Sequence, residues 1–178
     1  MTLGNAIDLG DLQTQRRANG ALGSPVRGVV VAGCTPTIFG NIEFFTPQSR
    51  GNAVSWGEMD RKRSPFAFSN STRGIIAGGF APSRLNSIEY LTIASAGTNV
   101  SDFGDLTQTK DSGGANGHSS NQVRGLITGG YDGSNLINNI DFITIATTGN
   151  AQDFGDCSRE KWGYVANTTD SHGGLGGF

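Results

Sequence analysis

Short apolar runs separated by turn residues are the main pattern along this chain. Runs such as 28–31 (Gly-Val-Val-Val), 74–77 (Gly-Ile-Ile-Ala) and 140–143 (Ile-Asp-Phe-Ile) have the length of β-strands. Gly, Asn, Ser or Pro bounds each of them, and these residues favour turns. The pattern therefore predicts many short strands joined by tight turns, which is an all-β protein.

The chain also repeats itself, and the first landmark is a glycine followed by an acid. The glycine recurs after 47, 47 and 51 residues (10 to 57, 57 to 104 and 104 to 155), which is a spacing typical of repeat architectures. A base stands six residues after each of these glycines. The glycines are Gly10, Gly57, Gly104 and Gly155, the acids are Asp11, Glu58, Asp105 and Asp156, and the bases are Arg16, Arg63, Lys110 and Lys161.

Two further landmarks lie between successive glycines. One is an Arg-Gly pair, at Arg27, Arg73 and Arg124, which leads into an apolar run that ends in glycine. The other is an apolar segment with an acid at its second position, at Ile42–Thr46, Ile88–Thr92 and Ile140–Thr144.

Each complete repeat is expected to form four strands, which in the best-defined copy lie around Ser64 to Asn70, Gly74 to Gly79, Ser87 to Ile93 and Val100 to Thr107. Four-stranded units at this spacing are typical of β-propeller blades, which stack because one blade cannot bury both of its faces. An open solenoid is the alternative. We predict a small single-domain β-propeller of about four blades, with repeat copies at 13–59, 60–106 and 107–157.

The last blade is expected to form from residues 1–12 and 158–178. The N-terminal segment resembles a fourth strand, so it can close the ring and remove exposed sheet edges. This blade lacks the third strand of its repeat, so it is either three-stranded or completed by another subunit.

Composition argues against several classes of partner. The formal net charge is -2, and the densest basic stretch is Arg61–Arg63, so a broad phosphate-binding surface is not expected. The apolar runs are far shorter than the roughly 20 residues that span a bilayer. We therefore expect neither nucleic-acid binding nor membrane insertion.

The recurring residues are interpreted as parts of the scaffold. A catalytic set is normally built once from unlike positions, whereas a residue that returns in each copy supports each copy. We expect Arg27, Arg73 and Arg124 to bond to a carboxylate or a turn carbonyl of the same or the next blade. The glycines at 10, 57, 104 and 155 are expected at bulges or positive-φ turns.

No catalytic, cofactor or metal pattern is found, so an enzyme is not expected. Cys34 and Cys157 are interpreted as buried thiols, and Trp56 as a packing residue of its blade. His118 and His172 have no counterparts in other copies and are expected to be solvated. Loops on a rigid scaffold often carry binding specificity, and the candidate binding loops are those of Phe80 to Arg84 and of Tyr131 and Asp132.

The segments Gly149–Asp156, Ser69–Gly74 and Ile143–Gly149 resemble the kelch-like repeats of virion proteins in marine tailed phages, cyanophages especially. The resemblance extends from Gly4 to Phe178, and the paired glycines at 78–79 and 129–130 resemble the double glycine of kelch repeats. It implies a virion structural protein, with other virion proteins of the capsid or tail as partners. The expected role is a knob-like capsid-decorating or accessory protein.

The alternative function is a tail- or fibre-associated propeller that binds a host receptor or glycan. Kelch-fold oxidases hold copper with His and Tyr, and the two separate histidines of this chain do not suggest such a centre.

Overall fold

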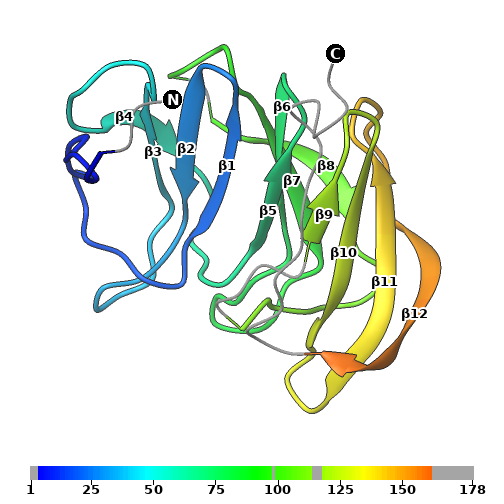
Figure 1. Ribbon diagram of the computed structural model, residues 1–178. Helices are drawn as coiled ribbons and strands as arrows, with labels where there is room; N and C mark the ends of the chain where they lie inside the picture. The colour runs from blue at the N-terminus through cyan, green and yellow to red at the C-terminus, as the bar shows by residue number, and fades with distance from the viewer. Residues whose placement is uncertain (1–3, 98, 114–117, 162–178) are drawn as a thin grey trace.

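The computed structural model describes residues 4–97, 99–113 and 118–161, and all regular structure in this part of the chain is β (Figure 1). The strands form three four-stranded antiparallel sheets, each a meander of strands consecutive in sequence. The first sheet contains β1 (Gly20–Ser24), β2 (Arg27–Val31), β3 (Asn41–Phe45) and β4 (Val54–Glu58). The second contains β5 (Phe66–Ser69), β6 (Arg73–Ala77), β7 (Ser87–Thr92) and β8 (Ser101–Asp105). The third contains β9 (His118–Ser120), β10 (Arg124–Tyr131), β11 (Leu136–Thr144) and β12 (Gln152–Lys161).

The all-β prediction is confirmed, and each sheet corresponds to one predicted repeat copy. The end of the third copy lies a few residues later than the rough boundary expected from the repeat. β12 continues past Cys157, because β10 and β11 form a longer hairpin that offers it more edge, and Lys161 pairs with Ile137. Residues 158–161 therefore belong to the third sheet instead of a fourth. Residues 162–178, on which the closing blade mainly depends, lie outside the described residues.

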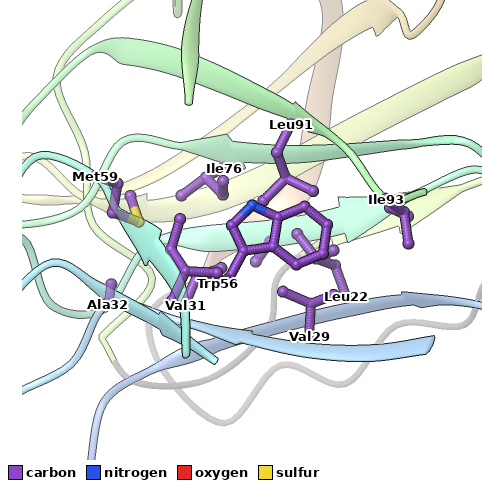
Figure 2. Packing of buried hydrophobic residues seen from close by; sticks show 11 residues of the cluster. Leu22, Val29, Val31, Ala32, Trp56, Met59, Ile76, Leu91 and Ile93 are labelled. Atoms are coloured by element: carbon purple, nitrogen blue, oxygen red, sulfur yellow. The ribbon is translucent and has the colours of Figure 1, made fainter. Parts of the chain in front are cut away.

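The sheets pack side by side, with β5 between β1 and β9 (Figure 1). β5 and β6 are buried on both faces, because the second sheet lies between the other two. Alternate side chains of each strand point to opposite faces of the sheet. Ala67 and Ile76 face the first sheet, while Phe68 and Ile75 face the third. Trp56, with 2% of its surface exposed, lies at the centre of the layer between the first and second sheets (Figure 2).

The glycine of the Arg-Gly landmark lets neighbouring sheets approach each other. A Cβ on Gly74 would lie 2.7 Å from Leu22 Cδ1, and one on Gly125 would lie 2.0 Å from Phe68 Cε2. Both contacts are with side chains of the preceding sheet. A larger residue at either position would therefore push two sheets apart.

Hydrogen bonds also join each sheet to the next. The Gly33 N–H donates to the Lys62 carbonyl at 3.0 Å, and the Gly79 N–H donates to the Lys110 carbonyl at 2.9 Å. Between the first strands of the second and third sheets, the Ser120 hydroxyl donates to the Ser69 carbonyl at 3.1 Å. Equivalent positions make equivalent bonds, so the sheets follow one another by a constant geometric step.

The N-terminal segment docks on the first sheet in the way that β8 docks on the third. Gly51 and Ala53 donate backbone hydrogen bonds to the carbonyls of Leu9 and Asp11, both at 2.8 Å. Gly149 and Ala151 make the same pair of bonds, at 2.7 Å, to the carbonyls of residues 103 and 105 in β8. Residues 9–11 therefore occupy the position of the fourth strand of a preceding sheet.

Candidate binding surface

The structure brings together three of the four residues predicted in the candidate binding loops. The guanidinium carbon of Arg84 lies 4.9 Å from the centre of the Phe80 ring and 4.6 Å from that of Tyr131. Its Nε also donates to Asp111 Oδ2 at 2.8 Å. Arg63 lies over the Phe80 ring at 4.6 Å. The loops of the second and third sheets thus share one arginine–aromatic surface, made of Arg63, Phe80, Arg84 and Tyr131.

Asp132, the fourth candidate, closes its own loop. Its Oδ1 accepts the backbone N–H groups of Ser134 and Asn135, both at 2.7 Å. Hydrogen bonds from Asn135 first, and then from Ser134, hold the pKa of this carboxyl below its ordinary value. Asp132 is therefore a fixed negative charge beside the arginine–aromatic surface.

The arginine–aromatic surface has the features of a recognition site. Its guanidinium groups are oriented by rings and by a carboxylate, so they are ordered before a partner arrives. Phe80 and Tyr131 are partly exposed and offer apolar area. Such a surface can bind a protein or a sugar, and it contains no arrangement of nucleophile and base.

The recurring arginines join neighbouring sheets. Arg27 Nη1 donates to the Ile93 carbonyl at 2.7 Å, and Arg73 Nη1 donates to the Ile145 carbonyl at 2.8 Å. In each case the carbonyl belongs to the next sheet, which is one of the two partners expected from the repeat. All three arginines also lie over a ring of their own sheet: Arg27 over Phe44 and Trp56, Arg73 over Tyr90, and Arg124 over Phe142.

The recurring acids do not pair with these arginines. Asp11, Glu58, Asp105 and Asp156 are exposed. Their backbones carry the structural contact, because the N–H groups of Asp11 and Asp105 donate to the side chains of Asn52 and Asn150, both at 3.0 Å. These asparagines stand five residues before the landmark glycines, a repeated signal that the sequence reading did not use.

The recurring glycines have positive φ angles, which favour glycine. The values are +143° for Gly10, +156° for Gly57, +142° for Gly104 and +129° for Gly155. In the three sheets the pairing register shifts beside this glycine, at Ile42/Glu43, Ile88/Glu89 and Ile140/Asp141.

The acids that matter for the core lie inside the third landmark instead. Glu43 pairs with Arg16, Glu89 with Lys62 at 2.6 Å, and Asp141 with Lys110 at 2.8 Å. In the second copy the buried base is therefore Lys62, one residue before the landmark base Arg63. The segment between the landmark glycine and the buried base is one residue shorter in this copy than in the first. Lys62 is therefore the buried base, and Arg63 lies over the Phe80 ring.

A pocket of about 400 Å³ lies between β1, β5 and β9, which are the first strands of the three sheets. His118 lines it beside Phe68, with ring centres 5.6 Å apart, and is not the solvated histidine that was expected. Burial lowers its pKa from 6.5 to about 4, so the ring is neutral at pH 7. The pocket's serines already bridge sheets, since Ser69 Oγ donates to the Gly23 carbonyl at 2.6 Å. The pocket is therefore mainly a packing feature of these three strands.

The two cysteines lie in different environments. Cys34 is buried, as expected, with 6% of its surface exposed. Cys157 is only partly buried, because the third sheet has no further described sheet on its outer side. His172 lies outside the described residues. In the described part of the chain, no group of three His, Cys, Asp or Glu side chains could hold a metal ion.

The described residues contain no helix with the length and hydrophobicity to span a bilayer. The fold and its surfaces define an all-β repeat protein in which recurring arginines join successive sheets and buried ion pairs hold each entering segment to its own sheet. No protein-family model matches the sequence, and no curated protein matches it.

Proposed function

We propose that the sheets are blades of a small kelch-like β-propeller of about four blades, closed by the N-terminal segment and residues 162–178. Two observations support closure. The segment at Leu9–Asp11 already occupies the place of a fourth strand against the first sheet. Phe154, at the position of Trp56 and Phe103, is 56% exposed where they are each 2% exposed, so the third sheet has a face fitted for a further blade.

Deletion of residues 1–12 tests the closure. The deletion removes the inter-sheet bonds at Leu9 and Asp11 and one side of the ring, so we expect a clear fall in the midpoint of thermal unfolding. An unchanged midpoint would contradict a closed ring.

We further propose that the protein is a phage virion structural protein, a knob-like capsid-decorating or accessory component that acts by protein–protein binding. The observation that carries a binding role is the arginine–aromatic surface around Arg84, displayed on sheets that ion pairs and shared hydrogen bonds make rigid. The resemblance to virion kelch-like repeats supplies the location. Scaffolds of this kind present loops without changing shape when they bind.

The test is mass spectrometry and cryo-electron microscopy of purified particles of a phage that encodes this sequence. We expect the protein in the particles, as ordered knobs on the head. Its absence from purified particles would contradict the proposal.

The second candidate is a receptor- or glycan-binding propeller of the tail or fibre. It is favoured by one observation, the grouping of Phe80 and Tyr131 around Arg84, because aromatic rings beside polar groups suit sugar faces. A glycan array with the wild-type protein and the Tyr131→Ala variant tests it. Val26→Ala is the matched control, since Val26 is 60% exposed and lies in the β1–β2 turn. This turn is at the opposite end of the sheet from the β2–β3 connection, whose counterparts in the other two sheets carry the candidate binding loops. A glycan signal lost in Tyr131→Ala and kept in Val26→Ala would favour this candidate, and density confined to the tail tip would support it.

A further inference from the structure

Three side chains of the third repeat copy form a buried cluster with unusual chemistry. Lys110 Nζ lies 2.8 Å from Asp141 Oδ2 and donates to Asn139 Oδ1 at 3.2 Å. The side chains of Lys110 and Asp141 are both 0% exposed. The cluster thus places a buried amine and a buried carboxylate in contact with a half-buried carboxamide.

Hydrogen bonds fix the orientation of the amide. Asn139 Nδ2 donates to Asp141 Oδ1 at 3.1 Å and to Thr107 Oγ1 at 3.3 Å, so its carbonyl oxygen faces Lys110. The Thr107 hydroxyl in turn donates to Asp141 Oδ1. The carboxylate therefore touches both nitrogen atoms, with Oδ2 beside the lysine and Oδ1 beside the amide nitrogen.

The other two sheets keep the ion pair but not the combination of a lysine, an asparagine and a carboxylate. In the second sheet Lys62 lies 2.6 Å from Glu89 Oε2, and the position of Asn139 is taken by Ser87, whose Oγ lies 3.4 Å from Lys62 Nζ. In the first sheet Asn41 takes the position of Asn139, and the base is Arg16, which is not a nucleophile. Among the three sheets, the third combines a lysine, an asparagine and a carboxylate at these positions.

We propose that Lys110 and Asn139 become joined by an amide bond between Nζ and Cγ, with Asp141 carrying protons between the two nitrogens. This crosslink is independent of the proposed virion function. It would tie the segment that enters the third sheet to strand β11, and it would close a covalent loop from residue 110 to residue 139.

The reaction balances without any added reagent. Lys110 passes a proton to Asp141 Oδ2, and the neutral amine attacks the Asn139 carbonyl carbon. Asp141 then gives its proton to Nδ2 and takes one from Nζ, the C–Nδ2 bond breaks, and NH3 leaves. The products are the Lys–Asn amide, ammonia and a neutral Asp141 carboxylic acid, so a buried pair of charges is replaced by neutral groups.

The surroundings favour this reaction. Burial lowers the pKa of Lys110 from its ordinary value, although the Asp141 carboxylate partly opposes the shift, and the neutral amine is the attacking form. Lys110 and Asp141 are buried, which keeps water away from the amine and from the carboxylate that moves its protons. The Phe66 ring lies 5.9 Å from Nζ and forms part of this dry environment.

Intact-protein mass spectrometry of the full chain tests the proposal. We expect a mass below the sequence mass by one NH3, about 17 Da, and a branched peptide that contains residues 110 and 139. Asn139→Ser should restore the full mass, and it should still fold because it copies the arrangement of Ser87 in the second sheet. Lys110→Arg should also restore it while keeping the charge, whereas the matched change Lys62→Arg should leave the loss of mass in place.

Far-UV circular dichroism would establish that each variant is folded. Wild-type protein at its full sequence mass after incubation at neutral pH would overturn the proposal. So would a loss of NH3 that persists in Asn139→Ser or that maps to another peptide, such as the one containing Asn19 and Gly20.

Discussion

Two phenylalanines at equivalent positions allow a sharp test of whether a further blade covers the third sheet. Phe103 in β8 is 2% exposed and meets Tyr90 edge-on, with ring centres 6.1 Å apart. Phe154 in β12 is 56% exposed and meets Phe142 in the same way, also at 6.1 Å. Because the contact within the sheet is matched, the two alanine variants differ mainly in what the next sheet contributes.

The magnitude follows from buried area. A phenylalanine offers roughly 200 Å², and at about 25 cal/mol per Å² its full burial contributes about 5 kcal/mol as an upper value. Phe103→Ala should therefore lower the free energy of unfolding by about 3–5 kcal/mol. Less than half of Phe154 is buried by the described residues, so without a covering blade Phe154→Ala should cost no more than about 2 kcal/mol.

A closed ring predicts that the two variants are destabilised equally, by about 3–5 kcal/mol each. Urea unfolding followed by tryptophan fluorescence and by circular dichroism measures both values, provided that the two probes coincide and the m-value is unchanged. A cost of about 2 kcal/mol or less for Phe154→Ala, beside the full cost for Phe103→Ala, would refute closure over this face.

Three further predictions concern the contacts between and within sheets. Arg73→Ala should lower the free energy of unfolding by about 2 kcal/mol, since it loses a charge-assisted bond and a ring contact, while the exposed Arg50→Ala should change it by less than about 0.5 kcal/mol in the same urea assay. His118 has a folded pKa of about 4, below its unfolded value of 6.5, so the unfolded state binds the extra proton. The free energy of unfolding should therefore fall by up to about 3 kcal/mol as the pH is lowered from 6.5 to 4. A His118→Gln variant with an equally steep pH profile would contradict this. Ser87→Asn gives Lys62 the amide neighbour that Lys110 has, with Glu89 in the place of Asp141, and a second loss of about 17 Da is expected in its mass spectrum. A single loss would show that a lysine, an asparagine and a carboxylate at these positions are not sufficient.

The inter-sheet role of the arginines illustrates how far local sequence reasoning reaches. The sequence placed Arg27 and Arg73 at the start of a strand in each copy, and their recurrence predicted a scaffold contact. It could not choose between a carboxylate and a carbonyl partner. That choice depends on the next sheet, which brings the carbonyls of Ile93 and Ile145 to the guanidinium groups.

The candidate binding loops show the same limit of local sequence reasoning. Phe80, Arg84 and Tyr131 were singled out because their loops differ between copies. Their convergence around one guanidinium depends on how the second and third sheets are placed, which no local pattern encodes.

The repeat, the number of strands in each copy, the turns and the special glycines could be predicted from the amino-acid sequence alone. These features follow from short-range alternation and from backbone conformations that few residues adopt, so they are visible within a few positions. Only the tertiary structure decided that Lys62, and not Arg63, is the buried base, that His118 is buried and Phe154 exposed, and that Lys110, Asn139 and Asp141 meet. The physical reason is that these outcomes depend on which way side chains point after a crossover and on whether another sheet packs against them.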